Sequence, residues 1–248
     1  MLQELRAMGA AAWQLPHALR QRGCQGIPHL AERNARYPVL LVHGYASTGS
    51  AWTPLRQALA AAGFGHIITV TYNSFTTDPA AVAAELTRQA LRALARAGAP
   101  RAHLIGHSLG GLIVGSALAA SAALSERTAA AVTIASPHRG VSLARLAPGR
   151  CARIMHPGRR PARPAAAAAP PLRWLAYYSD ADRVVPPASA RLDDPREGAA
   201  NLLIPGCGHL TICRDPRFIG SLVPELIRTE ALAGATRPAS ARREPVAA

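Results

Sequence analysis

The sequence predicts an α/β fold, with a doubly wound, mostly parallel β-sheet that carries helices on both faces. Short apolar runs alternate with helix-like segments along the chain, and this order is typical of parallel α/β proteins. The apolar runs lack the polar alternation of a half-exposed strand, as expected where helices cover both faces of a sheet. With 248 residues, of which 49% are hydrophobic, the chain is long enough to bury a substantial core in a single domain.

The strands are predicted from these apolar runs, and the helices from the segments between them. Strands are expected at 38–42, 67–71, 102–105, 131–135, 172–177 and 201–204. Helices are expected at 50–62, 80–97 and 112–123. The main domain is expected to extend from residue 37 to residue 230.

Three other segments differ from this pattern. Residues 1–36 carry apolar side chains at helix-like intervals and are predicted to form an N-terminal helical extension packed on the main domain. Residues 137–171 are rich in proline, arginine and alanine, so a flexible excursion or a minimal cap is expected there. Residues 231–248 have a similar composition and are expected to form a disordered tail.

The sequence shows no targeting or membrane-spanning segment. It contains no apolar run near the roughly 18 residues that a membrane span requires. Its first residues also lack the basic start, the apolar stretch and the small-residue cleavage site of a signal peptide. A cytoplasmic or membrane-peripheral location is therefore expected.

The chain is strongly basic, with a formal net charge of +14, and all 28 of its basic residues are arginine. A charge of this size suits nucleic acid or an anionic membrane surface. The absence of lysine indicates a compositional bias, and aromatic residues are not interleaved with the charge as they are in nucleic-acid-binding proteins. We therefore expect no dedicated nucleic-acid site and keep peripheral contact with an anionic membrane as an alternative.

The four cysteines predict neither a disulfide scaffold nor a zinc site, because they are few, scattered and without paired spacing. Cys207 and Cys213 flank His209, so a local disulfide between them is an alternative to free thiols. No metal site is predicted.

A nucleophile motif follows the third predicted strand. Residues 106–110 read Gly-His-Ser-Leu-Gly, which fits G-x-S-x-G, the pattern that places a serine on a strained turn between a strand and a helix. The pentapeptide alone would arise by chance in about one chain of this composition in ten, but the strand before it and the helix after it agree with the motif. Ser108 is therefore the predicted nucleophile.

An acyl-transfer site also needs two backbone amides for the oxyanion that forms on the attacked carbonyl. The amide of Leu109, directly after the nucleophile, is one predicted donor. The amide of Tyr45, in the loop after the first strand, is the other. His43 lies just before that loop's glycine and is predicted to hold the loop rather than to act as the base.

The acid and the base are expected on loops after later strands, in the order Ser, Asp, His. His209 lies in a glycine-rich loop after the sixth predicted strand and is the only histidine after His156, so it is the predicted base. Asp180 and Asp182 both follow the fifth strand, and spacing alone does not separate them.

Five short stretches stand at these turns: Val-His-Gly-Tyr at 42–45, Gly-His-Ser-Leu-Gly-Gly at 106–111, Ala-Ser-Pro-His-Arg-Gly at 135–140, Asp-Arg-Val-Val-Pro at 182–186 and Gly-Cys-Gly-His at 206–209. Together they resemble the lipase branch of the α/β-hydrolase family, over about residues 38–223. The resemblance implies an α/β-hydrolase fold with little or no cap and no metal or cofactor for catalysis. In this family the acid commonly opens an Asp-x-x-Val-Pro stretch, so the resemblance implies Asp182 rather than Asp180.

The resemblance further implies a serine hydrolase that cleaves carboxylic esters, of the lipase or esterase kind, through a Ser108-Asp182-His209 triad and an acyl-enzyme intermediate. Its expected partner is a small-molecule ester or lipid substrate. An acyltransferase or thioesterase that uses the same machinery remains an alternative, as does a non-catalytic binding protein of the same fold.

Overall fold

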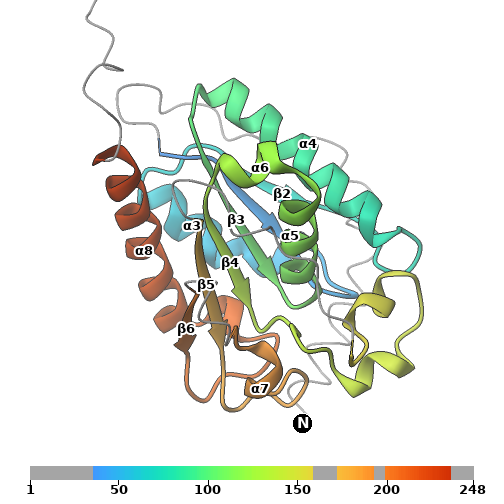
Figure 1. The fold of residues 1–248 in the computed structure, drawn as a ribbon. Coiled ribbons are helices and arrows are strands. Elements are labelled where there is room, and N and C mark those ends of the chain that lie inside the picture. Colours follow the sequence, from blue (N-terminus) through green and yellow to red (C-terminus); the bar gives the residue numbers. More distant parts are fainter. Residues whose placement is uncertain (1–35, 159–171, 193–198, 236–248) are drawn as a thin grey trace, which may run out of the picture.

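The computed structural model describes residues 36–158, 172–192 and 199–235, and within this part of the chain six strands form one sheet (Figure 1). The strands are β1 (Val39–Val42), β2 (Ile67–Val70), β3 (Ala102–His107), β4 (Thr128–Ile134), β5 (Arg173–Tyr178) and β6 (Ala200–Leu203). They lie in the order β2-β1-β3-β4-β5-β6, and every neighbouring pair is parallel. The predicted parallel α/β sheet is confirmed, with a strand at each of the six predicted places.

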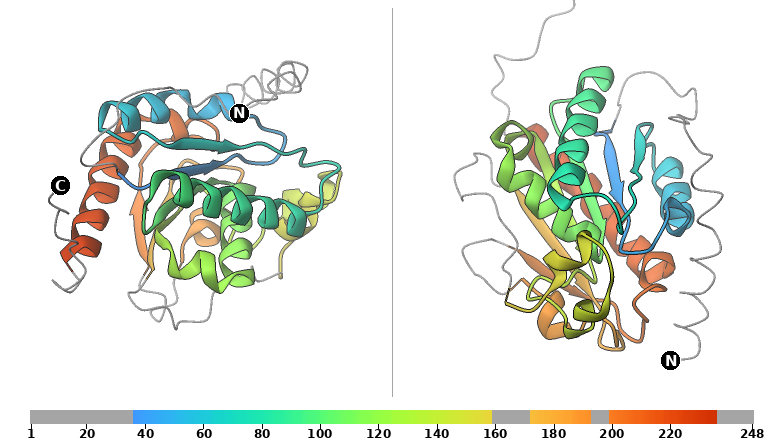
Figure 2. Two further views of the ribbon diagram at one scale, coloured as in Figure 1. Left: turned by 90° about the horizontal axis from the view of Figure 1, so that it is seen from above. Right: turned by 90° about the vertical axis from the view of Figure 1, so that its right-hand side faces the viewer.

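Helices cover both faces of the sheet, as predicted (Figure 2). On one face lie α4 (Pro79–Ala97), α5 (Leu109–Ala120) and α6 (Ala122–Glu126), and on the other lie α3 (Thr53–Ala61) and α8 (Pro216–Ala235). The short helix α7 (Pro187–Ala190) follows β5. The sequence sets the ends of α4 locally. Asp78 accepts the amide hydrogen of Ala80 at its start, and Gly98 ends it with φ of 58°.

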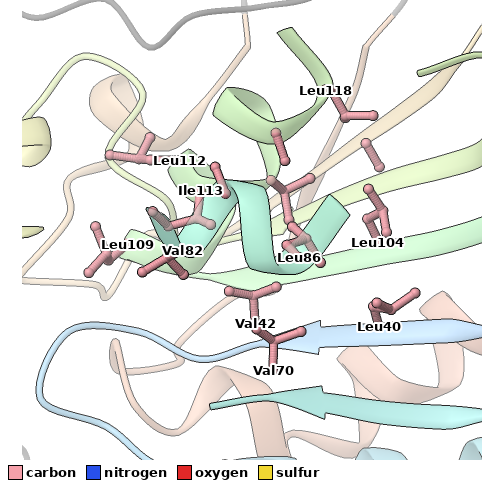
Figure 3. Packing of buried hydrophobic residues seen from close by; sticks show 14 of the residues in the cluster. Leu40, Val42, Val70, Val82, Leu86, Leu104, Leu109, Leu112, Ile113 and Leu118 are labelled. Carbon is pink, nitrogen blue, oxygen red and sulfur yellow. The ribbon is translucent and has the colours of Figure 1, made fainter. Parts of the chain in front are cut away.

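The larger part of the core lies between the sheet and the α4–α5 layer. Leu40 and Val42 point to this side of β1, where they meet Val70 of β2, Leu86 of α4 and Ile113 of α5 (Figure 3). All five side chains are fully buried. Burial of a leucine or isoleucine of this kind stabilises the fold by about 2 kcal/mol.

The opposite face of the sheet carries a second apolar cluster. Leu41 of β1 points to this side, because successive side chains of a strand alternate between the two faces. It belongs to one buried cluster with Leu55 and Leu59 of α3 and with Phe218 and Leu222 of α8. Strands that are apolar at every position are therefore explained by cover on both sides.

The helix α8 was not among the predicted elements, and it continues to Ala235, past the expected start of a disordered tail at residue 231. Its start has a signal in the sequence, since Asp215 precedes Pro216 and accepts the amide hydrogen of Arg217 at 2.8 Å. The expected tail is therefore wrong for residues 231–235, and residues 236–248 lie outside the described part.

The structure describes residues 137–158 of the predicted flexible excursion or minimal cap, and they contain regular structure. This segment forms two 3-10 helices, η2 (Ser142–Leu146) and η3 (Cys151–Met155). Val141 and Met155 are buried and belong to the core cluster under α4 and α5. Apolar residues spaced between exposed arginines thus anchor it. The rest of the predicted excursion and the helical extension predicted for 1–36, apart from Arg36, lie outside the described residues.

A buried polar cluster joins the amino end of β3 to α8, at the opposite end of the strand from Ser108. The carboxylate of Glu230 accepts the amide hydrogen of Tyr37 at 2.9 Å and pairs with His103 Nε2 at 3.1 Å and Arg36 Nη1 at 3.4 Å. His103 is fully buried, and this burial lowers its pKa, although the hydrogen bond to Glu230 opposes the effect. The cluster fixes the carboxyl-terminal helix on the sheet.

Candidate active site

The predicted site residues all follow the carboxyl ends of strands. Tyr45 follows β1, Ser108 follows β3, Asp182 follows β5 and His209 follows β6. The chain leaves β1 toward β2 on one side and returns to β3 on the other, so β1 and β3 flank a topological switch point. In open parallel sheets, ligands bind in the crevice outside such a point.

The turn at Ser108 is strained and tightly enclosed. Ser108 joins β3 to α5 with φ of 54° and ψ of −121°, a conformation that side-chain-bearing residues rarely adopt. A Cβ atom on Gly106 would lie 2.4 Å from the backbone of Gly110, and one on Gly110 would lie 2.1 Å from the carbonyl oxygen of Val42. Only glycine fits at 106 and 110, which explains the motif physically.

A continuous hydrogen-bonded chain links the three predicted catalytic side chains. His209 Nε2 lies 3.0 Å from Ser108 Oγ, and His209 Nδ1 lies 2.8 Å from Asp182 Oδ2. The three side chains come from loops up to 101 residues apart, and each residue is at most 6% exposed. A carboxylate beside Nδ1 favours the tautomer with its proton on that nitrogen, and in this tautomer Nε2 can accept a proton from a serine hydroxyl.

The structure also separates the two aspartates that spacing could not. The Oδ1 atom of Asp182 accepts the amide hydrogens of Val184 and Val185, both at 2.8 Å, so its Oδ2 atom is held toward His209. Asp180 does not pair with the histidine. It accepts the amide hydrogen of Gly206 at 2.7 Å and so supports the loop that carries His209.

His107 is a site residue that sequence reasoning missed. Its Nε2–H donates to the carbonyl oxygen of His209 at 2.9 Å, and the two rings lie 4.9 Å apart. Burial, reinforced by the neighbouring His209, lowers the pKa of His107 to about 3, so its ring stays neutral near neutral pH. The nucleophile motif contains His107 and so could have marked it as a residue near the site. Its role could not be predicted, because its hydrogen-bond partner lies 102 residues away in the sequence.

The predicted oxyanion donor Leu109 directly follows Ser108, and the loop of the other, Tyr45, comes close to Ser108. Leu109 is the first residue of α5, and the first amides of a helix have no carbonyl partner within it. The loop of Tyr45 approaches closely from β1, since a Cβ atom on Gly44 would lie 3.1 Å from Ser108 Cβ. The next amide, of Ala46, donates to Ser74 Oγ at 3.0 Å.

His43 holds the loop after β1. Its Nδ1–H donates to the carbonyl oxygen of Gly44 at 2.9 Å, and its Nε2 accepts the amide hydrogen of Tyr72 at 3.4 Å. The ring stacks on Tyr72, whose hydroxyl donates to the carbonyl of His43 at 2.7 Å. Burial lowers the pKa of His43, which favours its neutral form. Both ring nitrogens are used in the hydrogen bonds above, which hold the loop and do not involve Ser108.

Backbone strain gathers around the same end of the sheet. In the described part of the chain, the non-glycine residues with positive φ are Ala46, Ser108 and Ala135, at 49°, 54° and 49°. They follow β1, β3 and β4. Strained conformations of this kind persist where the surrounding structure holds them, and they cluster at functional sites.

The cysteines of the described chain are free thiols, so the alternative of a disulfide between Cys207 and Cys213 is wrong. Cys207 Sγ donates to Asp215 Oδ2 at 2.9 Å, and burial raises the pKa of this thiol to about 11. Among the described residues, no cluster of histidine, cysteine or acidic side chains could hold a metal ion. No helix in the described ranges is both long and apolar enough to cross a membrane.

Comparison with known proteins gives a consistent picture. The model of the alpha/beta hydrolase family matches residues 39–179. Two curated proteins named triacylglycerol lipase, from Pseudarthrobacter phenanthrenivorans and Burkholderia plantarii, are each 32% identical to the chain over 117 residues. The match covers 44% of this chain and 35% and 32% of the relatives, so the chain spans about a third of their length.

The fold is also found among solved structures. The mature form of a lipase from Bacillus licheniformis superimposes with a TM-score of 0.63 at 18% identity, over 81% of this chain and 96% of that chain. A monoacylglycerol lipase from Paleococcus ferrophilus superimposes with a TM-score of 0.53 at 18% identity, over 82% and 100% of the two chains. At this identity the likeness extends to the fold alone.

Proposed function

The chain belongs to the alpha/beta hydrolase family, and on this premise we propose that it hydrolyses carboxylic esters with Ser108 as nucleophile, His209 as general base and Asp182 as the acid that orients the base. The observation that carries the proposal is the unbroken chain of hydrogen bonds from Ser108 Oγ through the His209 ring to Asp182. The triacylglycerol lipase names of the two curated relatives support an ester or lipid as the substrate.

In the first half of the reaction, His209 Nε2 takes the proton from Ser108 Oγ while this oxygen bonds to the ester carbonyl carbon. The electron pair of the carbonyl moves onto its oxygen, where the amides of Tyr45 and Leu109 donate hydrogen bonds to the oxyanion. The tetrahedral intermediate then collapses, the bond to the alcohol breaks, and His209 gives its proton to the departing oxygen. An acyl group remains on Ser108.

In the second half, water replaces the alcohol. His209 takes a proton from water, the hydroxide oxygen attacks the acyl carbon, and a second oxyanion forms between the same two amides. Collapse returns the proton to Ser108 Oγ and releases the carboxylic acid. Asp182 orients the His209 ring and stabilises its imidazolium form in both halves.

The proposal is tested by the hydrolysis of p-nitrophenyl esters from acetate to palmitate. Ser108→Ala and Asp182→Asn are each expected to lower kcat by about 10⁴-fold or more. Asp180→Asn is the matched control, because it makes the same chemical change two residues away and keeps the Oδ1 atom that accepts the Gly206 amide hydrogen. This variant is expected to stay within about threefold of the wild type.

A fluorophosphonate probe provides a second readout that does not depend on the choice of ester. It is expected to label Ser108 covalently in the folded wild-type chain and to leave Ser108→Ala unlabelled. Absence of both labelling and turnover in folded wild-type protein would overturn the proposal. The ester chain length with the highest kcat/KM separates an esterase preference from a lipase preference.

A further inference from the structure

Two leucines are presented to solvent on one face of the 3-10 helix η2. Leu143 is 55% exposed and Leu146 is 83% exposed, and in the described ranges they share such exposure only with Leu203 and Leu232 among the large hydrophobic residues. In a 3-10 helix, side chains three residues apart are eclipsed, so these two project in the same direction. The helix is anchored from behind by Ala144, which is buried. The leucines are therefore held outward by an ordered segment.

This helix borders the candidate active site. The Tyr45 hydroxyl donates to the carbonyl oxygen of Pro148 at 2.5 Å, two residues beyond η2. The amide of Arg150 donates to the carbonyl oxygen of Phe75 in the loop after β2. The segment lies at the carboxyl end of the sheet, beyond the start of α5, in both orientations of the ribbon (Figures 1 and 2). The two leucines thus stand on the rim that carries Tyr45.

Positive charge surrounds the leucines. Arg145, Arg150 and Arg153 are all exposed, and the segment 137–158 contains no aspartate or glutamate. Within the described ranges, none of these three arginines takes part in an ion pair. Burial raises the pKa of Cys151 and the nearby Asp78 adds to this effect, but the single negative charge of Asp78 offsets at most one of the three arginines. The uncompensated charge is therefore positive.

We propose that this surface, made of Leu143, Leu146, Arg145, Arg150 and Arg153 and called here the leucine–arginine rim, docks on an anionic lipid surface. Arginines attract the negative headgroups, and leucines enter the boundary of the acyl chains. Two apolar side chains fall far short of the roughly 800 Å² per partner of a stable protein–protein interface, whereas apolar contact and a basic patch act together in binding to anionic lipid. If the proposed function holds, docking brings ester substrates in that surface to Ser108.

The test is sedimentation of the full chain with vesicles, in the Ser108→Ala background so that binding is measured without turnover. Vesicles of phosphatidylcholine with one quarter phosphatidylglycerol are compared with pure phosphatidylcholine. The wild-type rim is expected to bind only the anionic vesicles, with an affinity that falls as salt is raised. Replacing both leucines by serine is expected to weaken binding about tenfold.

The net charge of +14 draws the whole chain toward anionic surfaces, so the charge variant needs a matched control. Replacing Arg145, Arg150 and Arg153 together by glutamine is expected to weaken binding about a hundredfold, since each arginine contributes about fivefold. The control replaces the three exposed arginines of α4, Arg88, Arg92 and Arg96, by glutamine. It removes the same formal charge far along that helix, although Arg88 is paired with Glu85, and it is expected to cost less than about tenfold.

Equal losses in the two triple variants, with no effect of the leucine variant, would overturn the proposal and leave only attraction by net charge. Absence of binding to anionic vesicles overturns it as well. If the chain ignores vesicles but binds polyglutamate through the rim arginines, the surface recognises an acidic protein instead. Hydrolysis of soluble p-nitrophenyl acetate by the parent chain is measured separately, so failure of the ester-hydrolase proposal is not confused with failure of docking.

Discussion

Replacement of His107 by glutamine is expected to make the protein less sensitive to acid. The buried ring of His107 has a pKa of about 3 in the folded chain, against 6.5 for an ordinary histidine. Between these values the unfolded chain binds a proton that the folded chain excludes, so the free energy of unfolding falls as the pH falls through this window. Glutamine keeps an N–H for the carbonyl of His209 but does not titrate.

The magnitude follows from the distance on the pH scale. At pH 5, about 1.5 units below the unfolded pKa, His107 should have cost the wild type about 2 kcal/mol relative to neutral pH, at about 1.4 kcal/mol per unit. The pKa values of His43 and His103 are also lowered by burial, but these residues are present in both proteins. The difference between wild type and variant therefore isolates His107.

The measurement is urea unfolding of both proteins at pH 7 and pH 5, followed by tryptophan fluorescence. His107→Gln should lose about 2 kcal/mol less than the wild type between the two pH values. Equal losses in the two proteins would refute the reasoning that His107 is held neutral at the expense of acid stability. Turnover of p-nitrophenyl acetate by the variant at pH 7 checks that the loop of His209 is still in place.

Two further predictions concern opposite ends of the sheet. Gly110→Ala would put a Cβ atom 2.1 Å from the Val42 carbonyl oxygen, so it is expected to destabilise the fold by about 3 kcal/mol and to abolish turnover. The control is Gly220→Ala in α8, where the Cβ atom meets nothing within 4 Å, and thermal unfolding should show it to be neutral or stabilising. An active Gly110→Ala variant with a normal melting temperature would contradict this. Glu230→Ala leaves His103 without its hydrogen-bond partner and should lower the free energy of unfolding in urea by about 3 kcal/mol. The kcat for p-nitrophenyl acetate should stay within about twofold of the wild type. A large loss of kcat in a folded variant would show that the two ends of the sheet are coupled.

The sheet could be predicted because strands covered on both faces are apolar at every position. Residues 39–42 carry that signal without help from the rest of the chain, and in residues 102–105 only His103 departs from it. α8 was missed because Pro224 interrupts a mixed pattern in its interior, although Asp215 and Pro216 mark its start. Local patterns thus identified the strands and not the helix that closes the fold.

The candidate site was predictable in proportion to how local each signal is. The motif around Ser108 is a local signal, because its glycines are needed where neighbouring backbone leaves no room for a Cβ atom. Spacing alone left Asp180 and Asp182 open and the family resemblance implied Asp182, which is the aspartate that the tertiary structure places against His209. Only the tertiary structure shows the contact of His107, and the same holds for residues 137–158, where a few buried side chains outweigh an arginine-rich and proline-rich composition.

The hydrogen bond between Ser108 and His209 joins residues 101 positions apart, so the proposed activity requires that the last part of the described sheet has folded. His209 follows β6, which lies at the margin of the described sheet and pairs with β5 alone in it. Trp174 of β5 is buried in the cluster on the α4–α5 side of the sheet, whereas Trp52 shares the opposite cluster with Ile212 and Cys213, which follow His209. During refolding of single-tryptophan variants, the fluorescence of Trp174 should therefore recover ahead of turnover and that of Trp52 together with it. On warming, local release of β6 and the loop after it should abolish turnover while most of the sheet persists.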